Sequence, residues 1–362
     1  MRSLRLWSLA AFALSMLVDH APAFAEPYLA LRQGLKCVAC HVNPTGGGLR
    51  NDFGAVYAQQ LMPQRPTGET PIFSGKISDL LRVGADLRAS ASNISIPDQD
   101  SQHGFDLDQA RIYGAVTLIP QKLSLYVDEL VAPGAAQTEE AYVRYDDATR
   151  GWYLKGGRFY LPFGWRLQDQ SAFVRQVTGI NMATPDEGVE LGYESAQWSA
   201  QLAVSNGAGN AGQSSGHQVT AQAVWVRSAM RFGAAASMTD SDLGDRRMGG
   251  VFAGFKAGPL VLLGEADLVR DEGFADGPRS GVSALGEVNW GIRNGHNLKL
   301  TGEYYDPDRD VDEDEQNRWS LVYEYTPLPF VQLRAGYRRY EGIPQNDLQN
   351  RKLTFLELHG FF

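Results

Sequence analysis

Two-residue alternation of apolar and polar side chains is the feature that most limits what this chain can fold into. In the segment FVQLRAGYRRY, Val331, Leu333 and Tyr337 fall on one side, whereas Gln332 and Arg334 fall on the other. The segments NLKLTGEYY, DQARIYGAVTL and AYVRY repeat the pattern. A period of two places successive residues on opposite faces of a strand, so each segment is predicted to be a strand with one apolar and one polar face.

Sixteen segments of this kind follow one another, and helical periodicity is scarce after residue 70. They span residues 76–92, 105–119, 122–132, 138–147, 150–160, 188–195, 197–206, 217–228, 230–240, 246–256, 259–270, 280–290, 295–306, 316–326, 329–341 and 350–362. After the first residues of the chain, no stretch is apolar for the ~18 residues that a membrane-spanning helix needs. The sequence therefore predicts an all-β fold.

The connections between these strands alternate in length. Short ones such as PQ, GIRNG and PLP alternate with long ones such as NISIPDQDSQHG and DPDRDVDEDEQ. Outer-membrane barrels have an even number of strands, tight periplasmic turns, longer external loops and aromatic girdles. Trp152, Trp198 and Trp290 lie near strand ends, and the last strand closes on Phe362. We therefore predict a transmembrane antiparallel β-barrel of about 16 strands.

A soluble β-sandwich or β-solenoid is the alternative for alternating strands. A sandwich buries its apolar face against a second sheet, whereas a membrane barrel turns that face to lipid. Charges recur on the polar face of strand after strand, which favours a wet lumen. Sixteen strands enclose a wide bore, and two segments are candidates to narrow it: residues 26–70 and the long connection 161–187.

The first residues have the pattern of an export signal. Arg2 and Arg5 precede a short apolar run, and a small-x-small pattern ends at Ala25. The run is too short for a membrane anchor, so residues 1–25 are predicted to be a signal peptide and Glu26 the first mature residue. The net charge of −9 argues against a nucleic-acid partner.

Both cysteines of the chain lie in one motif, Cys37-Val38-Ala39-Cys40-His41. Cys-x-x-Cys-His is the attachment signature of c-type haem. Two thiols three positions apart add to the two vinyl groups on one porphyrin edge, and the next residue supplies an imidazole to the iron. A thioredoxin-like pair needs a βαβ setting that the sequence lacks, and a plain disulfide is the other alternative. We predict one covalent haem c, with thioethers to Cys37 and Cys40 and His41 as an axial iron ligand.

The second axial ligand has several candidates. Met62 precedes Pro63, and a methionine on a short loop is a common sixth ligand that raises the reduction potential. The rival ligands are His103, His217, His296 and His359. An open or water-bound site is the remaining alternative.

The residues after His41 suit a bulky ligand. NPTGGGLR is glycine-rich, which lets the backbone pass close to a large group. Phe53, Val56, Tyr57 and Leu61 then recur at helical spacing. This stripe is expected either to cover the ring or to pack on the barrel wall.

The chain resembles the fused monohaem cytochrome–porins of the bacterial outer membrane that are of the iron-oxidising type. The resemblance is carried by the leader, the single Cys-x-x-Cys-His close behind it and the one barrel that follows. The resemblance implies three parts: a signal peptide (1–25), a monohaem cytochrome c segment acting as a plug (26–70) and a porin-like barrel (71–362). A shorter stretch, GRFYLPFGWRLQDQSAFVR, resembles the loop region of phosphate-selective porins. It is carried by Gly157, Pro162, Phe163, Gly164, Arg166 and Arg175.

The cytochrome–porin resemblance implies transfer of electrons between an extracellular donor, with ferrous iron the family's substrate, and a periplasmic carrier. One alternative is a haem-plugged porin for small solutes or anions, with a narrow zone lined by Arg144, Lys155, Arg158, Arg166 and Arg175. Another is a barrel partner of a separate multihaem cytochrome. Seven acidic residues of one external loop are either a cation-gathering surface or a solvated loop: Asp306, Asp308, Asp310, Asp312, Glu313, Asp314 and Glu315.

Overall fold

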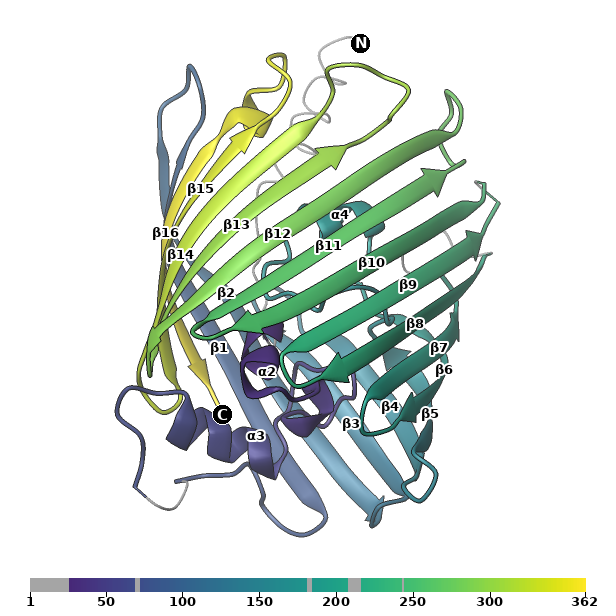
Figure 1. Cartoon of the computed structure of the whole chain (residues 1–362), viewed down its shortest axis with the longest axis vertical. Helices are drawn as coiled ribbons and strands as arrows, with labels where there is room; N and C mark the ends of the chain where they lie inside the picture. Colours follow the sequence, from purple (N-terminus) through teal and green to yellow (C-terminus); the bar gives the residue numbers. More distant parts are fainter. Residues whose placement is uncertain (1–25, 69–71, 181–183, 208–215, 243) are drawn as a thin grey trace.

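A computed structural model describes residues 26–68, 72–180, 184–207, 216–242 and 244–362. The predicted signal peptide, residues 1–25, lies outside the described residues. Within them, sixteen antiparallel strands form one closed barrel, in which each strand pairs with its sequence neighbours and β1 pairs with β16 (Figure 1). The predicted all-β, sixteen-stranded antiparallel barrel is confirmed.

The strands agree closely with the predicted segments. They are β1 (Leu81–Ser95), β2 (Gln102–Ile119), β3 (Leu123–Ala132), β4 (Gln137–Asp147), β5 (Trp152–Phe159), β6 (Asp186–Glu194), β7 (Trp198–Ser205), β8 (His217–Arg227), β9 (Met230–Asp240), β10 (Arg246–Ala257), β11 (Leu260–Asp271), β12 (Arg279–Arg293), β13 (His296–Asp306), β14 (Gln316–Leu328), β15 (Val331–Glu341) and β16 (Lys352–Phe361). The first strand begins at Leu81 rather than at residue 76. The Ser78 hydroxyl accepts hydrogen bonds from the backbone N–H groups of Leu80 and Leu81, and such a local turn competes with strand pairing.

The outer face of the barrel is apolar. Leu202, Val251, Leu300 and Leu356 are among its exposed side chains. A continuous apolar band around a protein marks contact with lipid rather than with water. Near the short turns it carries aromatic pairs, such as Trp152 with Tyr193, whose ring centroids are 4.9 Å apart. No helix in the described part of the chain is long and apolar enough to cross a membrane.

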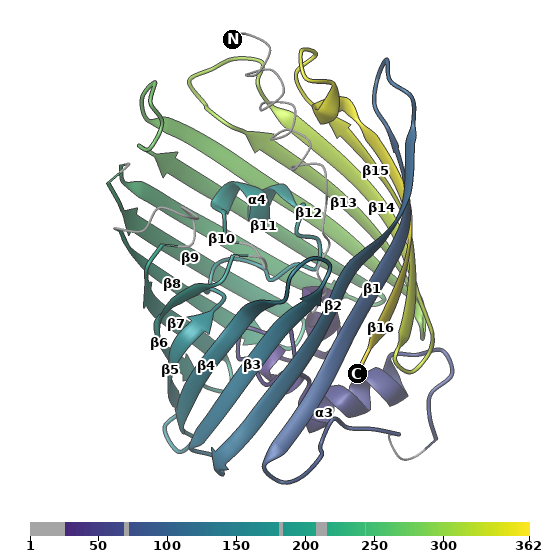
Figure 2. The ribbon, with the colours of Figure 1, turned by 180° about the vertical axis from the view of Figure 1, so that it is seen from behind.

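The remaining elements belong to the two segments predicted to narrow the bore. The N-terminal segment forms α2 (Pro27–Gln33), η1 (Cys37–Ala39), α3 (Asp52–Val56) and the π-helical turn η2 (Tyr57–Leu61), and the connection between β5 and β6 carries α4 (Phe173–Thr178). A short 3-10 turn, η4 (Asp347–Asn350), precedes β16. Figures 1 and 2 show α2 and α3 at the end of the barrel that carries the short turns, with α4 higher in the lumen.

Lumen side chains are buried rather than wetted. Lys155, Glu190, Asp267 and Asn289 have no measurable exposure. In an open bore of sixteen strands such residues would face water. The two segments therefore fill the lumen at this level.

Hydrogen bonds fasten the N-terminal segment to strands on opposite sides of the barrel. The Tyr28 hydroxyl donates to Glu324 on β14 at 2.7 Å. On the other side, Asn43 Nδ2 donates to Glu140 on β4 at 3.0 Å. Because these anchors lie on well-separated strands, the segment is held across the lumen rather than along one wall.

The two ends of the barrel carry opposite charge. Among the described residues, the exposed charged side chains at the short-turn end are Arg65, Lys76, Lys122, Arg150, Arg227, Lys256 and Arg293, against Asp52 and Asp79. At the long-loop end they are Asp98, Asp100, Asp106, Glu187, Asp240, Asp242, Glu272, Asp276, Asp310, Asp312, Glu313, Glu315 and Asp347, against Arg247, Arg270, Arg309, Arg339 and Lys352. The short-turn end is thus basic and the long-loop end acidic.

Candidate functional site

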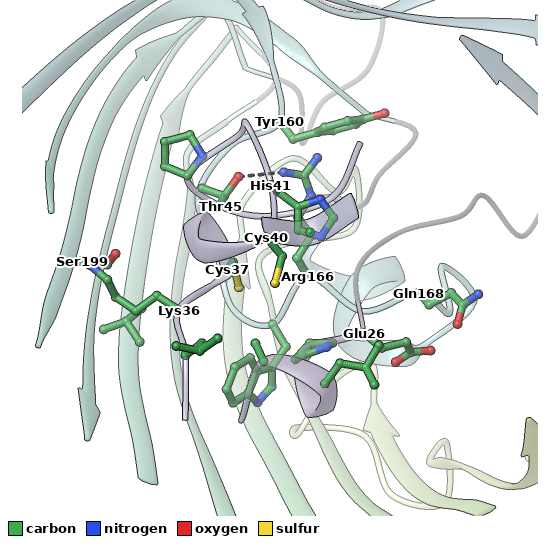
Figure 3. A pocket seen from close by; sticks show the side chains of 18 of the residues that line it. Glu26, Lys36, Cys37, Cys40, His41, Thr45, Tyr160, Arg166, Gln168 and Ser199 are labelled. Atoms are coloured by element: carbon green, nitrogen blue, oxygen red, sulfur yellow. Dashed lines mark hydrogen bonds between the residues drawn. The ribbon is translucent and has the colours of Figure 1, made fainter. Parts of the chain in front are cut away.

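The cysteine motif forms one tight turn inside the barrel. The backbone N–H groups of Cys40 and His41 both donate to the carbonyl of Cys37, at 3.1 and 3.2 Å. This turn brings both sulfurs and the imidazole to one region of the lumen (Figure 3). Both cysteines are half-buried free thiols, so they are not joined in a disulfide.

A cavity that opens to solvent contains the motif. Its empty space measures ≈ 1630 Å³, including the open solvent that reaches it. Cys37, Cys40, His41 and Met62 all line it. The sequence-predicted ligand residues are therefore brought together around one space.

Apolar and aromatic side chains supply much of the remaining wall. Trp165 and Phe163 come from the connection after β5, Phe252 from β10 and Phe361 from β16. The rings of Trp165 and Phe252 meet edge to face, with centroids 4.8 Å apart. Such a wall suits a large planar apolar ligand and excludes water from it.

His41 is in the state that a metal ligand requires. Burial, reinforced by the positive charges of Arg50 and Arg166, lowers the pKa of His41 to about 3. The imidazole is therefore neutral at ordinary pH and has a lone pair to donate. The backbone of Gly47 and Gly48 lies beside the ring and acts in the opposite direction, raising its pKa. Two thiols, a neutral imidazole and a thioether form a donor set that fits haem c.

Several basic side chains approach the motif. Arg231, from β9, places Nη1 3.6 Å from Cys37 Sγ and donates through Nη2 to the Leu35 carbonyl at 2.5 Å. Arg166 donates to the Thr45 hydroxyl at 2.7 Å, and Arg50 lines the same cavity. Burial raises the pKa of the Cys40 thiol to about 11, so this thiol is protonated at neutral pH.

The glycine run after the motif has a backbone conformation that favours glycine. Gly46, Gly47 and Gly48 all have positive φ, from 61° to 91°. A Cβ atom on Gly48 would lie 2.1 Å from the hydroxyl of Tyr126 on β3. The close approach that glycine permits here is therefore to the barrel wall.

The predicted helical stripe does not form one buried face. Tyr57 is buried, but Phe53 and Leu61 are exposed to 44% and 52%. The face that packs inward instead carries Gly54, Ala55 and Ala58, because only small residues fit against the cysteine motif. The expectation that the stripe covers a ring or packs on the wall is wrong for Phe53 and Leu61.

The candidates for the second axial ligand lie in different surroundings. Met62 lines the cavity and is half-buried. His359 also lines it, but Nε2 is 2.8 Å from Asp86 Oδ2 and Nδ1 is 3.1 Å from Gln332 Oε1. Both ring nitrogens of His359 are thus already engaged.

The other histidines lie away from the cavity. His103 and His217 are exposed, near the long-loop end of β2 and at that end of β8. His296 begins β13 and stacks on Tyr325, with ring centroids 4.6 Å apart. None of these three lines the cavity that holds the cysteine motif.

The described residues 161–180 of the connection lie inside the barrel, with α4 farther from the short-turn end than α3 (Figure 2). Arg175 pairs with buried Glu265 of β11 and donates to the Phe163 carbonyl at 2.8 Å. Arg318 of β14 contacts Asp169 at 2.9 Å. These ion pairs fasten the connection across the bore.

The basic residues proposed to line a narrow zone are mostly neutralised. Lys155 lies 2.9 Å from Glu190, and Arg144 pairs with Asp146. Arg158 does not line the lumen, because its register partners Ala141 and Glu187 are on the outer face. It pairs with Glu187 there.

Arg231, Trp165 and Phe252 were not foreseen as site residues. Arg231 has the opposite parity to the outward Phe232, so the strand pattern did place it in the lumen. Which lumen residues meet the motif depends on barrel closure, and no short-range signal carries that information. Among the described residues no group of three or more His, Cys, Asp or Glu side chains is arranged to hold a metal ion, the acidic loop included.

No protein-family model matches the sequence, and no curated protein matches it. Solved structures do share its fold. An anion-selective porin from Comamonas acidovorans matches with a TM-score of 0.64 and 11% identity, over 78% of this chain and 99% of that one. Outer-membrane OmpT of Vibrio cholerae gives a TM-score of 0.60 and 12% identity, over 79% and 99%.

The outer-membrane channel DcaP of Acinetobacter baumannii gives a TM-score of 0.57 and 13% identity, over 78% of this chain and 97% of that one. Identities this low concern the fold alone. In fold, the chain is similar to bacterial outer-membrane porins.

Proposed function

We propose that this chain is an outer-membrane barrel that carries one covalent haem c in its lumen and passes electrons between an external donor and a periplasmic carrier. The observation that supports it best is that Cys37, Cys40, His41 and Met62 all line one aromatic-walled cavity. When bound, the haem would supply one-electron chemistry at a potential set by its surroundings. The proposal also places residues 1–25 as the export signal and 26–70 as the haem segment.

Each residue of the site has a distinct role in this proposal. Cys37 and Cys40 would hold the haem through thioethers, neutral His41 would bind its iron, and Met62 is the candidate for a second iron ligand. Trp165 and its neighbours exclude water, which strengthens every electrostatic interaction in the cavity.

The side chains around the cavity would also affect the reduction potential of the haem. Arg231 Nη1 lies 3.6 Å from Cys37 Sγ, and a nearby positive charge favours the reduced form of the iron. The aromatic wall acts in the same direction by disfavouring added positive charge in an apolar space.

The position of the cavity bears on the direction of exchange. It lies at the short-turn end, which in outer-membrane barrels faces the periplasm, and residues of the stretch 161–180 form part of its wall. A periplasmic carrier therefore has the shorter route. An external reductant, ferrous iron included, must act across the fastened connection. The addition of ferrous ion, described below, tests this external donor.

Purified full-length protein tests the haem directly. Covalent haem should survive denaturation, remain on the polypeptide in a haem-stained gel and give a Soret band. The Cys37→Ala, Cys40→Ala double variant should lose both signals, and His41→Ala should keep the stain but change the spectrum. A pigment that washes off the denatured wild-type chain contradicts the proposal.

Ferrous ion tests the donor. Addition of ferrous ion to the oxidised protein should produce the reduced spectrum if iron is oxidised here. If only periplasmic-type carriers reduce the protein, the haem assignment stands and the iron donor fails.

A second candidate function is a haem-plugged porin for small solutes or anions. It is favoured by the fold, since structures with this barrel include an anion-selective porin and a channel. Single-channel conductance in planar bilayers, anion-selective and unchanged by His41→Ala, would support it over electron transfer. The segments inside the lumen predict a small conductance.

A further inference from the structure

The outer face of α3 and η2 is an exposed apolar surface at the short-turn end. Phe53 and Leu61 are exposed to 44% and 52%, although the same helical stretch packs tightly on its other side. Exposed large apolar side chains gathered at one site, with polar residues around them, mark interaction surfaces.

This surface is separated from the cysteine motif only by the helix itself. Asn51, at the start of α3, donates from its backbone N–H to the Cys40 carbonyl at 3.0 Å and from Nδ2 to the Val38 carbonyl at 3.1 Å. Gly54 lies against the same Cys40 carbonyl. A protein bound over Phe53 would therefore lie one helix diameter, about 10 Å, from the motif.

Basic side chains lie at the same end of the barrel as this apolar surface. Arg65 lies just beyond η2, and Lys122, Arg227 and Arg293 lie at or beside short turns of the barrel. In the part of the chain that the structure describes, none of these four makes an ion pair with a carboxylate. The acidic Asp52 and Asp79 nearby are already paired, with Arg82 and Lys76. The net field at this end is positive.

The opposite end of the barrel is acidic, so a charged partner is guided to one end only. An electron-transfer encounter needs little buried area, and complementary charge around a small apolar contact speeds association and fixes orientation. A basic surface with an apolar centre beside the cysteine motif has this composition.

We propose that Phe53, Leu61 and the basic residues of the short-turn end, Arg65, Lys122, Arg227 and Arg293, form a docking surface for an acidic, soluble electron-transfer protein. The inference rests on the proposed function for its purpose but not for the binding itself. Phe53 and Leu61 supply the apolar contact, and the basic residues supply the long-range attraction.

Anionic phospholipid is the competing occupant, because basic side chains at a membrane interface also attract headgroups. Contact with lipid does not account for a position directly over the cysteine motif. It is included as an outcome of the test.

The experiment uses the full chain in lipid discs of zwitterionic composition. Two probes are compared at about 20 and 200 mM ionic strength: an acidic flavodoxin and a basic mitochondrial-type cytochrome c. We expect the acidic probe to bind, the basic one not to, and the affinity for the acidic probe to fall at least tenfold at the higher ionic strength.

Matched charge reversals locate the surface. The double variant Arg227→Glu, Arg293→Glu should lose at least tenfold in affinity for flavodoxin at low salt. Arg309→Glu, Lys352→Glu, with the same charge change at the long-loop end, should bind as the wild type does. Phe53→Ser should weaken binding at both ionic strengths, because it removes the apolar contact rather than a charge.

The inference is overturned if both double variants lose affinity equally, if the basic probe is preferred, or if Arg227→Glu, Arg293→Glu alters only binding to phosphatidylglycerol vesicles. The haem proposal and the docking proposal are contradicted by different results. A wild-type protein with no Soret band that still binds flavodoxin retains the docking surface without the haem, whereas a haem-loaded protein that does not bind leaves the haem proposal intact.

Discussion

Gly54 of α3 lies directly against the backbone carbonyl of Cys40, where a Cβ atom on Gly54 would be 2.0 Å from the carbonyl oxygen. That distance is far inside van der Waals contact. The helix and the cysteine motif therefore form one packed unit, and their spacing requires glycine at position 54.

Substitution of Gly54 by alanine tests this unit. Alanine gains about 1 kcal/mol of helix propensity over glycine, but the methyl group meets rigid backbone, and overpacking of this kind costs typically about 1–3 kcal/mol. We expect the clash to prevail, with faster hydrogen exchange over residues 51–58 and less haem per chain. Gly68→Ala is the control, because an added Cβ there has no neighbour within 4 Å. Equal exchange in both variants would show that the contact is not tight.

Arg231→Gln removes the positive charge nearest to Cys37 while keeping the size of the side chain similar. Two unit charges about 10 Å apart, in an effective dielectric constant of about 20, interact by about 1–2 kcal/mol. We expect a lower midpoint potential in a redox titration at unchanged haem content. Arg247→Gln, exposed at the long-loop end, should leave the potential as it is. An unshifted potential in Arg231→Gln would mean that the charge is screened from the haem.

The barrel was predictable from the sequence because period-two alternation and connection length are local signals. Val331, Leu333 and Tyr337 were assigned to one face by parity alone, and Leu333 and Tyr337 are indeed exposed on the outer face. The same rule would have placed Arg158 outside, since it has the opposite parity to lumen-facing Lys155. Arg158 was assigned to the narrow zone of the lumen without applying this parity rule, so the pattern itself was not at fault.

Only those site residues that lie close together in the sequence could be predicted. Cys37, Cys40 and His41 lie within five residues, so their meeting needs one turn of backbone. Arg231 and Phe252 meet them only after closure of the barrel, across about 200 residues of chain. The inward face of α3 and η2 also escaped prediction, because its packing is set by Gly54 and Ala58 rather than by the large apolar side chains.

The connection 161–187 is held by charge, which predicts how it is released. Arg175→Gln leaves the buried carboxylate of Glu265 without its cation, and loss of one partner of a buried pair costs about 3–5 kcal/mol. We expect the connection to loosen and the single-channel conductance in planar bilayers to rise. Arg158→Gln is the matched control, because its pair with Glu187 is exposed on the outer face, where such pairs contribute about 0–1 kcal/mol. Similar conductance in the two variants would mean that the N-terminal segment alone closes the bore.

Glu26 predicts how the start of the N-terminal segment responds to pH. Burial, helped by the neighbouring carboxylates Glu324 and Glu287 and opposed by Lys299, raises the pKa of Glu26 to about 7 from an ordinary 4.5. A raised carboxyl pKa means that the docked segment binds more protons than the free one. Its stabilising contribution is complete below about pH 4.5 and is lost as the pH rises through about 7.

We therefore expect α2 to be held more weakly at pH 8 than at pH 5.5. The expected difference in free energy is of order 1 kcal/mol. It is this small because the contact of Glu26 with Lys299, at 2.6 Å, offsets part of the effect of burial. Hydrogen exchange of residues 27–33, corrected for the intrinsic pH dependence, measures it. Glu26→Gln stays neutral and should abolish the difference between the two pH values. If the wild type is instead held more tightly at pH 8, the ion pair with Lys299 outweighs burial and Glu26 is charged throughout.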